Sequence, residues 1–187
     1  MEVMILLIDI INFGISIIGL INKLTAEVVA KNNTDNNGRM ITKHASATGV
    51  RVYGWFLGRD LENDNLEWKT STTGSNWTGG YTVVNSYKTN THYYFTEVYN
   101  GSNALAYVDG LTDTRGDLPV FLTGNVYGRT QRFLSGNDGR LVTSTFHNGI
   151  IDKIQVSLID RSAAWIKATN ANFRVTLLIY GNEGIYP

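Results

Sequence analysis

Turn dipeptides recur along most of this chain and divide it into short segments. These dipeptides pair Gly with Gly, Asn or Asp, and the main ones stand at positions 79–80, 100–101, 109–110, 138–139, 148–149 and 181–182. Such pairs adopt the positive-φ turns that join antiparallel strands. A chain that turns so often cannot form long helices in this region, so the pattern predicts an all-β body after residue 38.

The segments between these turns have the length and period of β-strands. For example, the stretch 153–159 places Ile154, Val156 and Leu158 on one face, as a strand does. The predicted segments are 50–57, 66–72, 81–87, 92–99, 104–109, 120–123, 140–146, 153–159 and 173–180. They predict a mainly β fold, a β-sandwich of about nine to ten short antiparallel strands.

One stretch within this body, 161–168, suits either a short helix capped by Asp160 or another strand. We favour the helix, because a capping residue stands directly before an Ala-rich run.

The first thirty residues have a different pattern. Residues 1–24 are almost continuously apolar, and polar residues interrupt them at spacings of seven, three, four and seven: Glu2, Asp9, Asn12, Ser16 and Lys23. On a helix that advances 100° per residue, these five fall within an arc of about 100°. We therefore predict an amphipathic, membrane-active helix at 1–30, a flexible linker at 31–38 and the β-sandwich body at 39–187.

This N-terminal segment lacks the form of a secretory signal, because Glu2 replaces the basic front and Asp9 interrupts the apolar run. It is long enough to span a bilayer, but a central Asp costs about 2.5–3.5 kcal/mol on insertion. That cost shrinks if the polar residues face a water-filled lumen or another copy. A permanent anchor and a buried core helix remain alternatives.

Composition and motifs exclude several function classes. Sixteen basic and sixteen acidic residues give no net charge, which argues against a nucleic-acid binder. The chain has no Cys, and its three His residues lack metal-ligand spacing. It also carries no nucleophile elbow, P-loop or dinucleotide fingerprint. We therefore expect no cofactor, no metal and no enzymatic activity.

Aromatic residues are concentrated between positions 77 and 107. The alternation of 92–99 places Tyr93, Phe95 and Tyr99 on one face and Tyr94 on the other. Each ring taken singly fits a Tyr-rich core, but the group predicts some exposed rings that contact lipid headgroups or sugars. The candidates are Trp77, Tyr81, Tyr87, Tyr93, Tyr94 and Tyr99.

A mobile N-terminal helix, a sandwich of this size, the absence of Cys and a Tyr-rich middle together resemble the actinoporins. The tripeptide Arg115-Gly116-Asp117 matches one that this family carries and is a candidate oligomer contact. The resemblance implies a secreted cytolysin that docks on choline lipids, inserts its helix and assembles a pore. Thermostable direct haemolysins and fungal fruit-body lectins are similar to the actinoporins by fold.

Two hypotheses of function follow. In the first, the chain is a haemolysin-like toxin, secreted and then placed in the target-cell membrane, with Glu2, Asp9, Asn12, Ser16 and Lys23 lining an oligomeric pore. In the second, it is a carbohydrate-binding, lectin-like module whose aromatic rings stack on sugar. A tethered or structural sandwich domain is a further alternative. The partners are thus a lipid membrane and further copies of the chain, or a glycan.

Overall fold

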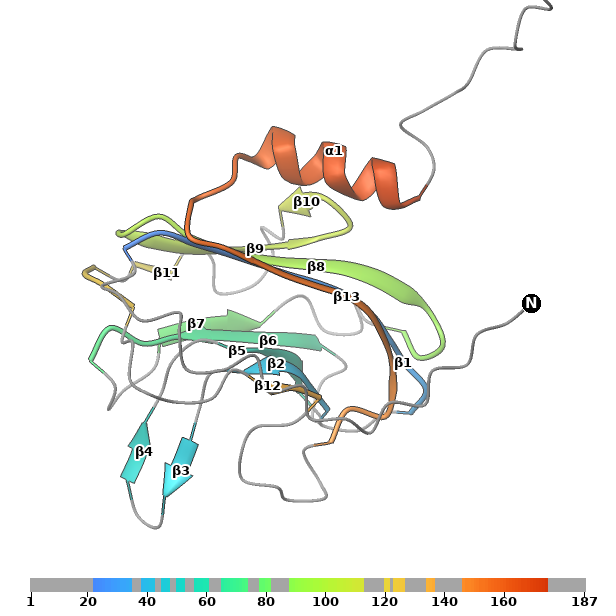
Figure 1. Ribbon diagram of the computed structural model, residues 1–187, viewed down its shortest axis with the longest axis horizontal. Coiled ribbons are helices and arrows are strands. Elements are labelled where there is room, and N and C mark those ends of the chain that lie inside the picture. The colour runs from blue at the N-terminus through green and yellow to red at the C-terminus, as the bar shows by residue number, and fades with distance from the viewer. Residues whose placement is uncertain are drawn as a thin grey trace, which may run out of the picture.

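Two antiparallel β-sheets pack face to face as a sandwich, and one α-helix lies on the outer face of the larger sheet (Figure 1). This arrangement is seen in a computed structural model. The residues that the structure describes are 22–34, 38–42, 45–47, 50–52, 56–60, 65–73, 78–81, 88–112, 120–121, 123–126, 134–136 and 146–174. The prediction of a mainly β sandwich is confirmed.

The larger sheet has the strand order β10-β9-β8-β1-β13, and β11 also pairs with β9. Its strands are β1 (Leu24–Asn32), β8 (His92–Tyr99), β9 (Asn103–Val108), β10 (Leu111–Thr112), β11 (Val120–Phe121) and β13 (Gly149–Ser157).

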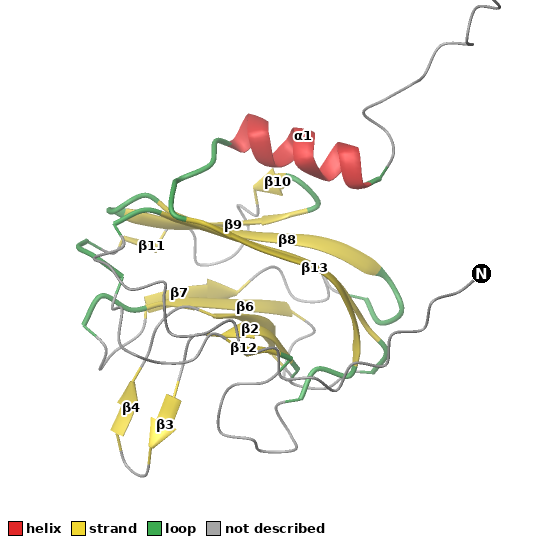
Figure 2. Cartoon of the chain, in the orientation of Figure 1, coloured by secondary structure: helices red, strands yellow, loops and turns green. Residues whose placement is uncertain are grey.

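The second sheet has the order β12-β2-β5-β6-β7, and a two-stranded hairpin stands apart from both sheets (Figure 2). The strands of the second sheet are β2 (Arg39–Thr42), β5 (Phe56–Asp60), β6 (Asn65–Thr70), β7 (Thr78–Tyr81) and β12 (Leu134–Ser135). The hairpin consists of β3 (Ala45–Ala47) and β4 (Val50–Val52).

Most of the hydrophobic core lies between the two sheets. Alternate residues of β1 face it, together with inward residues of β8, β9, β2 and β6, which is the period-two pattern of a strand. Its buried members are Leu24, Ala26, Val28, Ala30, Met40, Ile41, Trp68, Phe95, Tyr99, Ala104, Ala106 and Val126. A smaller cluster fills the space between the larger sheet and the helix, and its buried members are Tyr94, Val98, Tyr107 and Ile166.

The strand β1 corrects the predicted N-terminal organisation. Residues 24–30 form a strand rather than the end of a helix, and residues 31–32 continue that strand rather than starting a linker. β1 pairs with β8 on one side and β13 on the other, so pairing overrides the helix propensity of the segment. Residues 1–21, which carry the rest of the predicted helix, and residues 35–37 of the predicted linker lie outside the described residues.

The helix α1 (Ala163–Phe173) confirms the helix expected near 161–168 and extends it. Its cap is Ser162, whose side-chain oxygen accepts a hydrogen bond from the Trp165 backbone N–H at 3.2 Å. The predicted cap, Asp160, is wrong, because its carboxylate forms an ion pair with Lys23 instead.

Contacts at the other end of α1 hold it against the sheet. Asn170 Nδ2 donates to the Asp109 carbonyl at 2.7 Å, and the Arg174 guanidinium lies 2.6 Å from the Asp109 carboxylate. The Phe173 ring stacks at a tilt on Tyr94, with the Lys153 ammonium 4.5 Å from its centroid. Among the described residues, no helix is both long and apolar enough to cross a membrane.

The predicted strands agree best where alternation and turns coincide. The segment 92–99 is β8, and 66–72, 104–109 and 153–159 overlap β6, β9 and β13. The expected strand at 173–180 is wrong at its first residue, because Phe173 ends α1, and 175–180 lie outside the described residues.

The His147 ring is enclosed near the start of β13. A Cβ on Gly38 would lie 2.7 Å from the His147 Cα and 3.2 Å from its Nδ1, and one on Gly149 would lie 2.9 Å from its Nε2 and 1.9 Å from the Lys31 carbonyl. Both positions therefore require glycine. Burial lowers the pKa of His147 to about 4, so its neutral form is the one that fits.

The two phenylalanines Phe95 and Phe173 test where the core lies. We expect Phe95→Ala to lower the free energy of unfolding by about 3–5 kcal/mol, because Phe95 is completely buried between the sheets. Phe173 is 40% exposed, so Phe173→Ala should cost about 1 kcal/mol or less. Urea denaturation of both variants measures the difference. Equal losses would contradict this placement of the core.

His147 should make stability depend on pH. Its pKa is about 4 in the folded protein and about 6.5 in the unfolded chain, so the unfolded chain binds more protons between these values. Stability should therefore fall by about 3 kcal/mol in all as pH drops from about 6.5 through about 4, and this group should cause no further loss well below that.

Urea midpoints measured across this range test the effect. His147→Asn should remove most of the slope, whereas the exposed control His92→Gln should keep it. A slope that persists in His147→Asn would assign the effect to another group.

Candidate functional site

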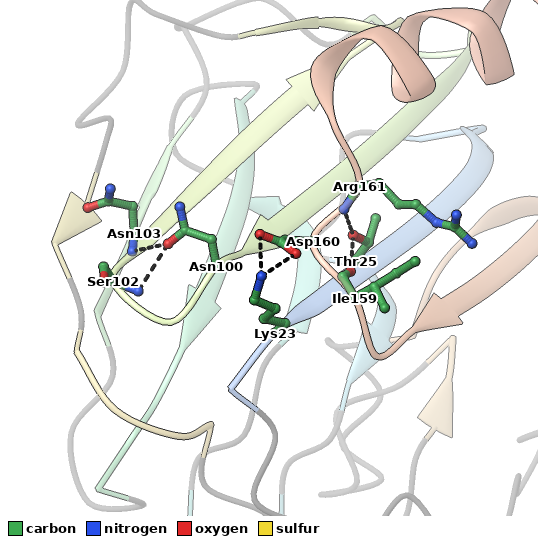
Figure 3. Close-up of polar contacts among 8 residues, drawn as sticks. All are labelled: Lys23, Thr25, Asn100, Ser102, Asn103, Ile159, Asp160 and Arg161. Carbon is green, nitrogen blue, oxygen red and sulfur yellow. Dashed lines mark hydrogen bonds and ion pairs between the residues drawn. The ribbon is translucent and has the colours of Figure 1, made fainter.

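Three parts of the chain meet at one end of the larger sheet, where β1 begins, β8 ends and the chain leaves β13 (Figure 3). Leu24 pairs with Tyr99 and Thr25 pairs with Ser157, so the residues beyond these pairs lie side by side. A Cβ on Gly101 would lie 3.1 Å from the Asn22 carbonyl. We call the polar residues gathered here the polar loop end: Lys23, Asn100, Ser102 and Asp160.

The Thr25 hydroxyl fixes the loop between β13 and α1. It donates to the Ile159 carbonyl at 2.7 Å and accepts from the Arg161 backbone N–H at 2.9 Å. Thr25 itself is completely buried. Asp160, between these two contacts, is therefore held in one place by backbone on both sides.

Lys23 and Asp160 form an ion pair at the surface. The Lys23 ammonium lies 2.9 and 3.1 Å from the two Asp160 carboxylate oxygens. The hydrogen bond from Lys23 holds the pKa of the Asp160 carboxyl below its usual value. Because both side chains are partly exposed, the pair adds little stability but presents a donor and an acceptor together.

Asn100 closes the turn between β8 and β9. Its Oδ1 accepts hydrogen bonds from the backbone N–H groups of Ser102 at 3.0 Å and Asn103 at 2.8 Å. These two donors identify the side-chain oxygen. The Nδ2 group of this exposed residue is then directed away from the turn and can donate to a ligand.

The adjacent loop at 123–126 supports this turn. The Tyr99 hydroxyl donates to the Gly124 carbonyl, and the Gly124 N–H donates to the Gly101 carbonyl at 3.4 Å. At the residue after Asp160, the Arg161 guanidinium lies 4.3 Å from the centroid of the Trp165 ring. The polar loop end is thus built on ordered backbone.

The groups at this end are suited to neutral polyols. A carboxylate accepts hydrogen bonds, whereas an amide NH₂ and an ammonium donate them, and neighbouring sugar hydroxyls need both kinds of partner. Lys23 and Asp160 also cancel each other's charge. Among the described residues, no three or more acidic, His or Cys side chains gather as a metal site.

A second polar cluster lies beneath α1 and is closed to solvent. The Tyr94 hydroxyl donates to Oε1 of Glu27, and both residues are buried. Burial and the Glu27 carboxyl group raise the pKa of the Tyr94 phenol, so Tyr94 keeps its proton. This contact joins β8 to β1 and has no route to a ligand, so we interpret it as structural.

The structure separates the predicted aromatic candidates. Tyr94 is 2% exposed and Tyr99 is completely buried, so the prediction that they contact lipid or sugar is wrong. Both faces of β8 are covered, one by the second sheet and one by α1. Tyr93 is half-buried and stacks on Phe95 with centroids 5.6 Å apart.

The remaining predicted residues are only partly described. Tyr81 ends β7 and pairs in register with Glu67, which is buried and ion-paired to Arg39 at 2.9 Å. Lys23, predicted to line a pore, instead pairs with Asp160. The others lie outside the described residues: Glu2, Asp9, Asn12, Ser16, Trp77, Tyr87, Arg115, Gly116 and Asp117.

Sequence reasoning did not identify the polar loop end as a site. Local patterns place Asn100 in a turn, predict Asp160 as a helix cap and include Lys23 in the N-terminal helix. The turn chemistry of 100–101 does predict exposure. That these loops meet depends on the pairing of β1 with both β8 and β13, which no local pattern reveals.

Comparison with known proteins yields relatives by fold alone. No family model matches the chain, and no curated protein matches it. Solved structures do match: a heptameric SAP-like pentraxin from Limulus polyphemus has a TM-score of 0.56 at 10% identity, over 80% of this chain and 70% of the pentraxin.

Two further matches concern carbohydrate. A putative carbohydrate binding protein from Bacteroides ovatus has a TM-score of 0.52 at 15% identity, over 80% of this chain and 41% of that protein. Domain 4 of the Geobacillus stearothermophilus arabinanase AbnA, solved with arabinotriose, has a TM-score of 0.56 at 11% identity, over 78% of this chain and 65% of that one. The chain therefore spans less than two thirds of each. None of these structures is an actinoporin, and that resemblance stays a hypothesis.

Replacing Thr25 tests the anchoring of the loop that carries Asp160. Thr25→Val keeps the volume but leaves the Ile159 carbonyl and the Arg161 N–H without this partner, so we expect a loss of about 1–3 kcal/mol in unfolding free energy. Thr112→Val, at an exposed position of β10, should change it by about 0.5 kcal/mol or less. Equal effects in urea denaturation would mean that Thr25 does not hold the loop.

Proposed function

We propose that this chain is a carbohydrate-binding, lectin-like β-sandwich module that contacts a glycan at its polar loop end. The observation that carries the proposal is the sandwich that it shares with a putative carbohydrate binding protein and with an arabinanase domain solved with arabinotriose. Since a fold supports many functions, the argument for the site depends on its own groups.

Those groups support binding in two ways. The Lys23 ammonium, the Asn100 amide and the Asp160 carboxylate supply donors and acceptors within one exposed region. They are also held by contacts to backbone or to each other, so that less conformational freedom is lost on binding than with free side chains. Binding without chemical turnover suits this set, because it includes no nucleophile with an adjacent base.

The pore-forming hypothesis receives less support. The rings expected to touch lipid include Tyr94 and Tyr99, which are buried, and Lys23 of the predicted pore lining holds Asp160. The end of the predicted helix is the strand β1. We therefore favour the lectin-like alternative.

Glycan arrays probed with the full chain, followed by titration of the best glycan and of arabinotriose, test this function. Asp160→Asn should weaken binding about tenfold or more, equivalent to about 1.4 kcal/mol, because the strongest acceptor is lost. Asn100→Ala should weaken it similarly. Absence of binding to any glycan would overturn the proposal.

A matched control separates local from general charge effects. Asp152 on β13 is also half-exposed and pairs with a basic group, the His92 imidazole, at 3.0 Å. His92 begins β8 and Asn100 follows its end, so the two sites are about 26 Å apart along the strand. Asp152→Asn should leave affinity unchanged. Equal losses in both Asp variants would mean that the polar loop end is not the site.

A further inference from the structure

The turn Asn100-Gly101 has a geometry that favours reaction between its own two residues. Asn100 is exposed, and Gly101 has a φ of +94°, in the region that L side chains rarely adopt. Glycine also leaves its backbone nitrogen open to approach, because it carries no side chain beside that nitrogen.

The side chain of Asn100 points forward along the chain. Its Oδ1 accepts from the N–H groups of Ser102 and Asn103, which both follow Gly101 in sequence. To reach them, the amide must lie over the Gly101 peptide, as in an Asx turn. The turn restricts the Asn100 side chain to the side of the residue that faces Gly101, so less conformational freedom is lost when Cγ approaches the Gly101 nitrogen.

The same two N–H groups are placed to stabilise negative charge on Oδ1. When a nucleophile adds to an amide carbon, the carbonyl oxygen becomes an oxyanion, and donors already aimed at it lower the barrier. The backbone at 102–103 therefore forms a small oxyanion hole around Asn100.

We propose that Asn100 is a self-modification site that deamidates through a cyclic imide, with water as the only co-reactant. The Gly101 nitrogen gives its proton to solvent and bonds to Cγ, and the oxyanion on Oδ1 is held by Ser102 and Asn103. The Cγ–Nδ2 bond then breaks, and Nδ2 leaves as ammonia after taking a proton. Water opens the imide at either carbonyl to give aspartate or isoaspartate, with no oxidation or reduction.

The chain contains an internal comparison at Asn148-Gly149. Asn148 is also exposed, but its backbone carbonyl is bonded to the Asn33 N–H at 2.8 Å at the start of the extended strand β13. Among the described residues, no backbone N–H donates to the Asn148 side chain. In the part of the chain that the structure describes, the same dipeptide therefore occurs once with the oxyanion hole and once without it.

The consequence for binding rests on the proposed function. Deamidation replaces the Asn100 Nδ2 donor with a carboxylate and adds one negative charge beside the Lys23–Asp160 pair. A glycan that accepts a hydrogen bond from Asn100 Nδ2 would lose that hydrogen bond. The affinity of the polar loop end for its glycan would then fall as the protein ages, at the rate at which Asn100 deamidates.

Peptide mass mapping of the full chain, incubated in mildly alkaline buffer, tests the modification without any glycan. In the folded protein we expect Asn100 to deamidate about tenfold faster than Asn148, a barrier difference of about 1.4 kcal/mol. In urea the two rates should become similar, because both hydrogen-bond environments are lost. Asn100→Gln, which would need a larger ring, should remove the signal at position 100.

Two results would overturn the proposal: Asn148 reacting as fast as Asn100 in the folded chain, or Asn100 reacting more slowly folded than in urea. Titration of aged protein separates the two claims. Deamidation with unchanged glycan affinity would keep the modification and remove Asn100 from the binding site. Weaker affinity in proportion to the deamidated fraction would support both.

Discussion

The pairing of β1 with strands on both of its sides is the constraint on which the rest of this structure depends. β1 hydrogen-bonds to β8 and β13 along nearly its whole length, and its alternate residues enter the core between the sheets. Its other face lies under the helix, where Glu27 meets Tyr94. A segment that is paired at both edges and covered on both faces cannot leave the body without exposing a large apolar area. A hinge at this point, as a swinging helix would require, is therefore incompatible with the sheet.

The tyrosines have a structural role in the part of the chain that the structure describes. The hydroxyls of Tyr94 and Tyr99 are bonded to Glu27 and to the Gly124 carbonyl, so these buried polar groups have partners. Burial raises the pKa of Tyr94, Tyr99 and Tyr107 alike, which keeps their hydroxyls protonated. In the function that we propose, recognition depends instead on polar loop residues, which are held by ordered backbone. The ordered backbone also explains the proposed reactivity of the Asn100 turn, because the N–H groups that fix the Asn100 amide also stabilise the transition state of its deamidation.

Much of the fold was predictable where local chemistry and tertiary environment agree. The alternation of 92–99 gave β8, and turn pairs such as 100–101 and 109–110 marked the ends of strands. The helix near 161–168 followed from its cap and composition, although the cap is Ser162. The candidate site was much less predictable. Its residues are far apart in sequence, and each had a plausible local role of its own.

The sequence by itself determined the mainly β class, the division of aromatic rings between the two faces of β8 and the exposure of the Asn100 turn, because period and turn chemistry are local properties. Only the tertiary structure decided that residues 24–32 are a central strand, that α1 buries Tyr94, and that Lys23, Asn100 and Asp160 share one end of the sheet. The physical reason is that strand pairing and face coverage join residues more than a hundred positions apart, as between Lys23 and Asp160. An amphipathic pattern predicts that one face of a segment is buried, but it does not predict which element packs against that face.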